Sequence, residues 1–432
     1  MLEHVGMRVL IFSQHFPPET MATGRRARDL AESLTSRGHE VTVITGRPNH
    51  PSSLDLPFCQ HAAQDEYTAQ GYRILRVPVF RSLDSGTLKR FLTYSTFMLS
   101  AAWCGIWQRK PDVVLAVSPL PTGLAALPAH AWHRAPLVFD LQDIWPDSAL
   151  AVGLLHGSCL MGLLRCLEQF FYRRCAKVVV ITEGFERYLL NLGLPRNRVA
   201  VVCNGVQWQS FVGVKPREEL RKSVGLAGKF VVGYVGNIGL AQGLETLLGA
   251  AEQLRDEPVA FLLVGEGTDK RRLLDLARAR ALANVRFLAG VPGDQVFPIL
   301  ATCDALLVIL RKDPLFEITI PSKLYEYMAA GKPILCSVGG EAAELVSELG
   351  CGLPVAPSDS AALAESVRRL QANPQWGRLL GEAGADCVRE VFSRDSLMDA
   401  YAQLVENEAM GRAHAATDCS APFAEDIACG EP

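Results

Sequence analysis

The residues best suited to chemistry lie in the stretch PSKLYEYMAAGKP. Ser322, Lys323 and Glu326 are spaced so that one helix would carry them on one side of its first turns. Pro321 suits the start of such a helix, and Gly331 suits its end. A helix N-terminus attracts anions such as phosphate, and a carboxylate beside it can accept hydrogen bonds from sugar hydroxyls. A solvated face with a Lys323–Glu326 ion pair is the alternative.

A glycine-rich stretch, GYVGNIGLAQG, follows an apolar run. Gly236 and Gly239 would let backbone N–H groups approach phosphate oxygens, and Gly265 and Gly267 form a second such turn. The G-x-x-G-x-x-G spacing differs from the dinucleotide pattern, and the sequence contains neither a Walker sequence nor D-x-D. A diphosphate would therefore be held by backbone N–H groups and Lys323, with no metal ion. An ordinary tight turn is the alternative.

Candidate residues in the first half of the chain also follow apolar strands. Gly24 and Arg25 come shortly after the first strand, and Gln142 and Asp143 come directly after a later one. Such loops lie at the carboxyl edge of a parallel sheet, where ligands bind in α/β proteins. The run of arginines that starts at Arg25 could meet a pyrophosphate or form a solvated helix face. Asp143 could position a substrate or cap local backbone.

The elements that must position these residues alternate between apolar strands and amphipathic helices, which predicts parallel sheets covered by helices. The pattern occurs twice, so we predict an α/β protein with Rossmann-like domains over 1–206 and 207–390 and a cleft between them. A helix over 391–408 and a disordered, small and polar tail over 409–432 complete the chain. The predicted strands are 9–12, 41–45, 112–117, 136–141, 178–183, 199–202, 230–235, 259–264, 285–288, 305–310 and 334–336.

Composition narrows the class of protein. The chain has 432 residues, of which 49% are hydrophobic, enough for two well-cored domains. A net charge of -3 argues against a nucleic-acid binder. The 12 cysteines show no spacing typical of a metal site or a disulfide framework, which favours a reducing cytoplasm. The first six residues contain an acid and no apolar run, so we expect no signal peptide.

Two apolar segments, 90–107 and 154–174, raise the question of a membrane. Each is rich in aromatic residues, and the second ends in basic ones. The first is too short and too often interrupted by Thr and Ser to predict a bilayer span. A buried helix is one interpretation, and a helix lying in the membrane interface is the other.

The order and spacing of several motifs carry a family resemblance from Met7 to about Glu406. These motifs are FPPE at 16–19, RGHEV at 37–41, NGV at 204–206, GNIG at 236–239, GEG at 265–267 and EYMAAG at 326–331. Together they resemble glycosyltransferase family 4, the retaining, nucleotide-sugar-dependent enzymes of the GT-B fold. QDIWPDS at 142–148 and PSKLYEYM at 321–328 look like the bacterial O-antigen and colanic-acid subgroup that includes the WbuB-type L-fucosamine transferases.

The sequence departs from the family pattern at several site positions. The family places two glutamates eight positions apart; the second matches Glu326, but the first falls on Ile318, next to Glu317. The family's phosphate-binding Arg and Lys match Asn237 and Gln242. A His-Asp pair common in the family appears as Gln142-Asp143, and Asn-Gly-Val-Asp appears as Asn204-Gly205-Val206-Gln207. Lys323 and its helix N-terminus would supply the missing positive charge.

The resemblance implies transfer of a sugar from a nucleoside diphosphate, UDP by preference, to a lipid-pyrophosphate-linked saccharide at the inner membrane face. It implies retention by front-face displacement, with no cofactor and no protein nucleophile, and a C-terminal helix that crosses back to the first domain. Asp143, Lys323 and Glu326 would act in catalysis, with Glu326 on the ribose hydroxyls and Val291 near the base. The implied donor-binding residues are Gly236, Asn237, Gly239, Gln242, Gly265, Gly267, Val291, Ser322 and Tyr325, and the acceptor-binding residues are Gly24, Arg25 and Gln142.

Three other functions remain open from the sequence. A nucleotide-sugar epimerase can share the fold and would need no lipid acceptor. A catalytically silent nucleotide-sugar-binding subunit of an envelope assembly complex would be consistent with Ile318 in place of glutamate. A dinucleotide oxidoreductase is disfavoured, because the first domain lacks G-x-G-x-x-G after its opening strand.

Overall fold

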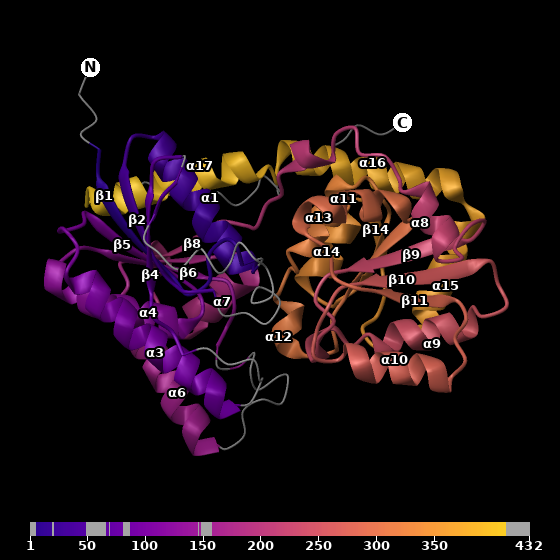
Figure 1. The fold of residues 1–432 in the computed structure, drawn as a ribbon, viewed down its shortest axis with the longest axis horizontal. Coiled ribbons are helices and arrows are strands. Elements are labelled where there is room, and N and C mark those ends of the chain that lie inside the picture. Colours follow the sequence, from indigo (N-terminus) through magenta and orange to yellow (C-terminus); the bar gives the residue numbers. More distant parts are fainter. Residues whose placement is uncertain are drawn as a thin grey trace. The chain divides into compact units, whose positions relative to one another are not determined.

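The computed structural model describes residues 6–19, 21–48, 66–68, 70–80, 87–145, 147 and 158–411. The chain divides into two compact units (Figure 1). Unit 1 comprises Met1–Cys203 and Asp395–Pro432, and unit 2 comprises Asn204–Arg394. The boundary therefore lies a few residues before position 206, and the C-terminal helix is grouped with unit 1.

Unit 1 is built on an eight-stranded sheet with the order β3-β4-β2-β1-β5-β6-β7-β8. All neighbouring strands pair in parallel except β3, which is antiparallel to β4. The strands are β1 Arg8–Ser13, β2 Glu40–Gly46, β3 Glu66–Tyr67, β4 Arg73–Val77, β5 Val113–Val117, β6 Leu137–Leu141, β7 Lys177–Val180 and β8 Val199–Val201. Its helices are α1 Ala22–Ser36, α3 Thr87–Ile106, α4 Leu120–His133, α6 Ser158–Tyr172, α7 Glu183–Asn191, the short 3-10 helix Arg196–Arg198 and α17 Arg394–Ala409.

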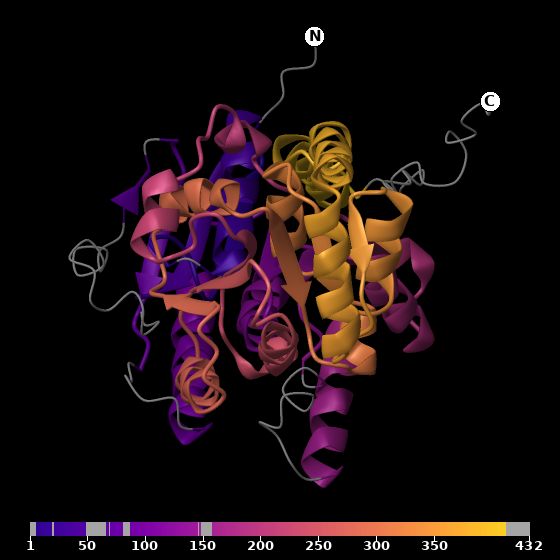
Figure 2. The same ribbon diagram turned by 90° about the vertical axis from the view of Figure 1, so that its right-hand side faces the viewer.

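Unit 2 is built on a six-stranded, wholly parallel sheet with the order β11-β10-β9-β12-β13-β14. In Figure 2, helices flank its strands on both sides. The strands are β9 Phe230–Val235, β10 Val259–Val264, β11 Val285–Leu288, β12 Ala305–Ile309, β13 Ile334–Ser337 and β14 Gly352–Pro354. The α-helices are α8 Glu218–Ser223, α9 Glu245–Gln253, α10 Lys270–Ala279, α11 Gly293–Thr302, α12 Pro314–Glu317, α13 Lys323–Ala329, α14 Glu341–Glu348, α15 Ser360–Ala372 and α16 Pro374–Glu390, with 3-10 helices at Trp208–Phe211 and Leu240–Gln242.

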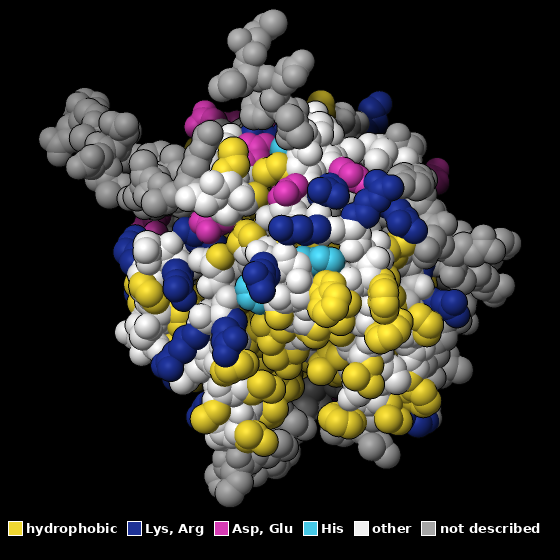
Figure 3. Space-filling model, turned by 90° about the vertical axis from the view of Figure 1, so that its left-hand side faces the viewer, with side chains coloured by type: hydrophobic (Ala, Val, Ile, Leu, Met, Phe, Trp, Pro, Cys, Tyr) yellow, Lys and Arg dark blue, Asp and Glu magenta, His cyan; other side chains and the backbone are white. Residues whose placement is uncertain are grey.

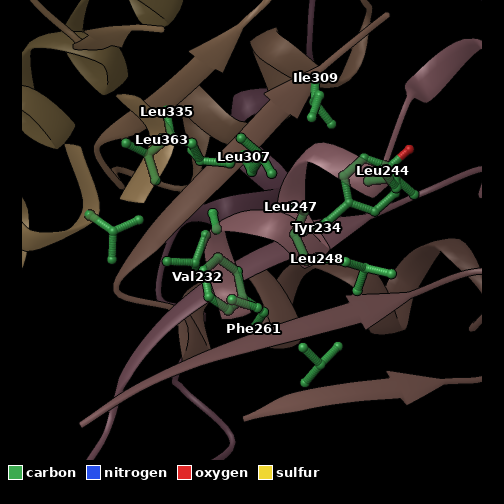
Figure 4. Close-up of a cluster of buried hydrophobic side chains, with 14 of the residues drawn as sticks. Val232, Tyr234, Leu244, Leu247, Leu248, Phe261, Leu307, Ile309, Leu335 and Leu363 are labelled. Atoms are coloured by element: carbon green, nitrogen blue, oxygen red, sulfur yellow. The ribbon is translucent and has the colours of Figure 1, made fainter. Parts of the chain in front are cut away.

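The core of unit 2 explains why its strands read as unbroken apolar runs. Side chains of β9, β10 and β12 pack with those of α9 and α15 in one buried cluster (Figure 4). Val232, Phe261 and Leu307 are fully buried in it, as are Leu247 of α9 and Leu363 of α15. A strand covered by helices on both faces has no solvent side, so its apolar residues need not alternate with polar ones.

The last helix, α17, completes the core of unit 1. Met398, Tyr401, Ala402 and Val405 are buried in the same cluster as residues of β1, β2, β5 and α1. Arg37, which follows α1, pairs with Glu406, whose carboxylate also bonds His39 Nε2 at 2.8 Å. The helix predicted over 391–408 is thus an integral part of unit 1.

The predicted fold class is confirmed, since both units are α/β with parallel sheets covered by helices. The prediction missed β3, β4 and β14. The helix predicted to start at Pro321 begins two residues later, since α13 starts at Lys323. Ser322 makes no side-chain capping bond, and Gly331 follows the end of the helix with φ 65°. Positions 146, 148–157 and 412–432, which include part of the QDIWPDS motif and most of the predicted tail, lie outside the described residues.

Candidate active site

The strand order of unit 2 reverses between β9 and β12, and ligands of open α/β sheets bind outside the carboxyl ends of the strands at such a reversal. The loop after β9 and the loop after β12 meet there. Arg311 donates its backbone N–H to the carbonyl of Ala241 at 2.9 Å, and its Cα lies 3.2 Å from where a Cβ on Gly243 would be. This part of unit 2 is therefore the candidate donor site.

Two glycine turns interlock beside this reversal. Gly236 donates to the carbonyl of Val264 at 2.9 Å, and Ile238 donates to that of Glu266 at 2.8 Å. A Cβ on Gly265 would collide with the carbonyl of Gly236, and one on Gly267 with the carbonyl of Ile238. Close backbone packing between the turns therefore explains Gly265 and Gly267 without a ligand.

The same contacts correct one part of the sequence-based picture. The N–H groups of Gly236 and Ile238 are bonded to carbonyls, and that of Gly239 donates to Gln242 Oε1 at 3.0 Å. These three N–H groups are already satisfied within unit 2, so the glycines shape the turn more than they offer donors. Asn237, between them, has an exposed side chain.

Lys323 is the cation that faces this turn. Its Nζ donates to Tyr234 Oη at 2.7 Å and lies 3.9 Å from the centre of that ring. The same Nζ lies 3.2 Å from where a Cβ on Gly236 would be, so the glycine leaves room for the ammonium group. Burial lowers the pKa of Lys323 to about 7, although the charge of Glu326 acts in the opposite direction.

Two tyrosines hold Lys323 in this place. Tyr327 Oη accepts from the N–H of Val235 at 2.8 Å and donates to its carbonyl at 2.9 Å, which fastens α13 to the end of β9. Tyr234 Oη donates to the carbonyl of Asn237 at 2.6 Å, which fixes the glycine turn to the same strand. Sequence reasoning missed both roles, because the sequence around a tyrosine does not show which group its hydroxyl will contact.

The remaining residues of α13 divide between the surface and the core. Ser322 and Glu326 are half-buried on the side that carries Lys323. Tyr325, one of the predicted donor-binding residues, has a buried side chain. It is 1% exposed and packs on the Phe392 ring, with centroids 4.9 Å apart, so it forms part of the core of unit 2.

The ends of β10 and β11 are tied together next to the glycine turns. Lys270 Nζ donates to the carbonyls of Gly265 and Leu288 and to Glu266 Oε1, all within 2.9 Å. Glu266 Oε1 also accepts from the N–H of Gly290 at 3.1 Å, and the hydrogen bond from Lys270 lowers the pKa of Glu266. The half-buried Val291 follows directly and so stands at the carboxyl edge of the sheet.

The residues at the family's first glutamate position lie outside α13. Glu317 ends the four-residue α12 and Ile318 follows it, so neither shares a helix with Glu326. The exposed Glu317 packs against the turn after β13, where Gly340 has φ 59° and has no room for a Cβ next to the carbonyl of Glu317.

In unit 1, the strand order reverses between β1 and β5, and the candidate acceptor residues follow β1 and β6. Gly24 is buried in the first turn of α1, and a Cβ there would lie 2.9 Å from the carbonyl oxygen of His15. This close approach of helix to loop explains the glycine. Arg25, next to it, is half-buried.

The neighbouring arginines have partners inside unit 1. Arg26 is buried, and its Nε donates to Asp140 Oδ2 at 2.8 Å while its Nη2 donates to the carbonyl of Val202 at 2.8 Å. Arg28 donates to Asp29 at 2.6 Å. Arg26 therefore joins α1 to the ends of β6 and β8, and the sequence-based suggestion that it meets a pyrophosphate is wrong.

Gln142 and Asp143 occupy the loop after β6, as the sequence indicates. The N–H of Gln142 donates to Ser118 Oγ at 3.0 Å, which ties this loop to the one after β5. Asp143 is exposed. Asp147, farther along, contacts side chains of α6 and α7, a connection that the sequence gave no reason to expect.

A patch of exposed apolar side chains covers the helices α3, α4 and α6 of unit 1. Figure 3 shows them gathered in the lower half of this face, with Lys and Arg side chains around them. A groove of 660 Å³ between β4 and α3 is lined in part by Trp103 and Trp107, whose rings meet edge to face at 5.6 Å. The patch consists of Phe91, Leu92, Leu99, Trp103, Trp107, Trp132, Leu163 and Phe170, each 36% to 73% exposed.

The described part of the chain contains neither a bilayer-spanning helix nor a cluster of metal ligands. None of its helices is both long and apolar enough to cross a bilayer. Over the same residues, no three side chains of His, Cys, Asp or Glu gather as ligands for a metal ion.

Both halves of the chain match models of glycosyltransferase families. Residues 22–205 match the glycosyl transferase 4-like domain, and residues 216–386 match the glycosyl transferases group 1. Over 393 residues the chain is 29% identical to WcaI of Escherichia coli (strain K12), a glycosyl transferase named for colanic acid biosynthesis. That alignment covers 87% of this chain and 93% of WcaI.

Solved structures show the same fold at low sequence identity. Sucrose-phosphate synthase from Thermosynechococcus elongatus has a TM-score of 0.76 at 18% identity and covers 94% of this chain and 100% of its own. Anabaena HepE, solved with UDP and glucose, has a TM-score of 0.70 at 18% identity. That match covers 93% of this chain and 100% of the HepE chain.

Proposed function

Because the chain is a glycosyltransferase, with a glycosyl transferase 4-like domain followed by a glycosyl transferases group 1 domain, we propose that it moves a sugar from a UDP-sugar to a lipid-linked saccharide. The observation that carries the proposal is the position of Lys323 at the glycine turn beside the reversal of unit 2. A cation, a tight turn and the half-buried carboxylate of Glu326 together suit a nucleoside diphosphate. The UDP bound in HepE supports uracil as the base.

In the proposed reaction, Lys323 neutralises the diphosphate as it leaves the anomeric carbon. The ammonium group exchanges its contact with Tyr234 for the phosphate oxygens and is held there by the Tyr327 anchor. Glu326 accepts hydrogen bonds from the ribose hydroxyls, and Val291 lies near the base. The departing phosphate helps to deprotonate the acceptor hydroxyl on the same face of the sugar, which gives retention without cofactor, metal ion or protein nucleophile.

The proposed acceptor is a saccharide on a polyprenyl pyrophosphate, placed by Gly24, Arg25, Gln142 and Asp143. The patch on α3, α4 and α6 supports this choice, because exposed tryptophans bordered by basic side chains suit the surface of an anionic membrane. The likeness to WcaI supports a role in a bacterial surface polysaccharide, such as O-antigen, capsule or exopolysaccharide. The protein would then act in the cytoplasm, at the inner face of the membrane.

A donor panel tests the proposal. The purified protein is incubated with radiolabelled UDP- and GDP-sugars and with membranes that carry lipid-linked acceptors. We expect label from one UDP-sugar to enter the lipid fraction, with retained anomeric configuration by NMR. Glu326→Ala should reduce transfer at least about a hundredfold if the ribose contacts are lost, whereas Glu344→Ala, an exposed glutamate of α14, should not.

Other results of the donor panel would distinguish the two alternative functions, an epimerase and a catalytically silent subunit. A rearranged donor or free UDP without any lipid product would indicate an epimerase. Donor binding by calorimetry without turnover on any acceptor would indicate a silent subunit, for which Ile318 in place of glutamate is the specific argument.

A further inference from the structure

The loop after β6 is fastened at Asp147 to two helices of unit 1. Arg165 of α6 donates to Asp147 Oδ1 from Nη2 at 2.5 Å and from Nε at 3.2 Å. Tyr188 of α7 donates to Asp147 Oδ2 at 3.3 Å. Both carboxylate oxygens of Asp147 are therefore engaged within unit 1, so its role is to hold the loop and not to bind a substrate.

A buried carboxyl group stands behind this contact. Glu168 is 1% exposed, accepts from Tyr172 Oη at 2.7 Å and lies 3.5 Å from Tyr188 Oη. Burial raises the pKa of Glu168 to about 7, against the hydrogen bond from Tyr172, which favours the charged form. Tyr188 thus lies between Glu168 and Asp147, and its position on α7 is set by both.

We infer that Arg165 is a positioning residue for the acceptor loop. The inference rests on the proposed function, in which Gln142 and Asp143 meet the acceptor. These residues begin the loop at the end of β6, where Gln142 is bonded to Ser118. Asp147, four positions after Asp143, is held by Arg165 and Tyr188, so these two side chains restrict the movement of the loop that carries Asp143.

The exposure of Arg165 distinguishes this role from a contribution to overall stability. Its side chain is 51% exposed, whereas that of Asp147 is 20% exposed. Exposed ion pairs contribute little to the stability of a whole domain. Breaking this pair should therefore release the loop locally and leave the fold of unit 1 intact.

Hydrogen–deuterium exchange of the full-length protein tests the contact without relying on activity. In Arg165→Met, backbone amides at 143–145 and 147 should exchange about three to ten times faster, because the loop loses one charged anchor. Tyr188→Phe should act in the same direction. Arg165→Lys keeps a cation and should restore slow exchange. Arg196→Met is the matched control, since the side chain of Arg196 is 68% exposed and pairs with Glu186 of α7 at 3.3 Å.

Kinetics test the positioning role itself. For Arg165→Met the KM for the lipid-linked acceptor should rise about three- to tenfold, while UDP-sugar hydrolysis in the absence of acceptor stays unchanged. Unchanged exchange at 143–145 and 147, or an equal rise in Arg196→Met, would overturn the inference. So would a fall in kcat with an unchanged acceptor KM. A wild-type protein with no transfer activity would overturn the proposed function alone, because the exchange comparison would still decide whether Arg165 holds the loop.

Discussion

At the scale of single residues, Lys323 has an unusual environment for a surface-facing cation. Its ammonium group lies over the ring of Tyr234 and against Gly236, and burial lowers its pKa to about 7. In the empty protein, the neutral form therefore predominates above pH 7. A bound diphosphate would favour the charged form, so we expect donor binding to be linked to proton uptake.

Calorimetry with UDP in buffers of different ionisation enthalpy measures this uptake. At pH 8 the wild-type protein should take up most of one proton per UDP bound, since its lysine is mostly neutral before binding. The affinity should fall by up to about tenfold per pH unit above pH 7 and level off below it. Lys323→Met should lose the extra uptake and bind UDP more weakly at pH 6. Equal proton uptake in the two proteins would refute the role of Lys323.

The sequence predicted on which elements the site residues lie better than it predicted what their side chains contact. It placed Gly236 and Gln142 in loops that follow strands and Lys323 in the first turn of a helix, because glycines, helix starts and strand ends have local signals. The sequence could not show that Arg26 is buried against the sheet whereas Arg25 is half-buried, because both are arginines at adjacent positions of the same helix. Tyr325 likewise looked like a site residue, although its ring packs on Phe392, 67 positions later in the chain.

At the scale of elements, α17 is held to unit 1 by a charged contact as well as by apolar packing. Glu406 accepts from Arg37 Nη2 at 2.9 Å and from His39 Nε2, and the hydrogen bond from Arg37 lowers the pKa of Glu406 to about 2. The pKa of this carboxyl group is near 4.5 in the unfolded chain and lower in the folded protein, so the contact stabilises the fold at pH values above 4.5. This stabilisation is lost as the pH falls towards 2.

Thermal unfolding as a function of pH tests this contact. Glu406→Gln should destabilise unit 1 on the order of 2 kcal/mol at pH 7, and the difference from the wild type should shrink below pH 4.5. Gln403→Ala removes an uncharged partner of Arg37 on the same helix and should cost less, with no dependence on pH in this range. A constant difference for Glu406→Gln between pH 7 and pH 3 would argue against the charged contact.

The aromatic patch on α3 makes a second prediction at this scale. Trp103 and Trp107 are 66% and 69% exposed, and the exposed Arg109 and Lys110 follow the helix. Replacing both tryptophans with serine should weaken binding to phosphatidylglycerol-containing vesicles at least about tenfold, because each indole contributes roughly 1–3 kcal/mol when buried. Vesicle cosedimentation measures the loss. Leu379→Ser, an exposed apolar residue of α16, is the control, and an equal effect there would contradict a specific membrane face.

The elements that the sequence missed share a physical cause. β4 reads RILRV, in which two arginines interrupt the apolar run, and β14 is three residues long and contains Gly and Pro. Such strands are stabilised by their neighbours in the sheet and not by their own propensity. The long apolar strands β9, β10 and β12 were predictable because burial on both faces leaves a continuous hydrophobic signature.

At the scale of the whole molecule, the two units differ in whether they are formed by one continuous segment of the chain or by two. Unit 2 is one continuous segment, Asn204–Arg394, with its own buried cluster, whereas unit 1 needs residues from both ends. We therefore expect residues 204–394, expressed alone, to unfold cooperatively and to bind UDP. Residues 1–203 alone should not fold, because the surface that Tyr401 and Val405 cover would be exposed.

Circular dichroism and UDP calorimetry check both fragments. Adding a peptide of residues 394–411 to the first fragment should restore its cooperative unfolding transition, which tests α17 directly. A stably folded 1–203 fragment without the peptide, or a 204–394 fragment that fails to fold, would contradict this division of the chain.

The late position of α17 has a consequence for how the protein is made. On the ribosome, the strands of unit 1 emerge first, but the helix that closes their core emerges only after about 190 further residues. At about 5–20 residues per second, this interval lasts roughly 10 to 40 s. During that time the nascent first half exposes the apolar surface that Met398 and Tyr401 will cover, while the segment that forms unit 2 is being synthesised. Chaperone dependence during synthesis should therefore be concentrated in the first half of the chain, whose core stays incomplete until α17 has been made.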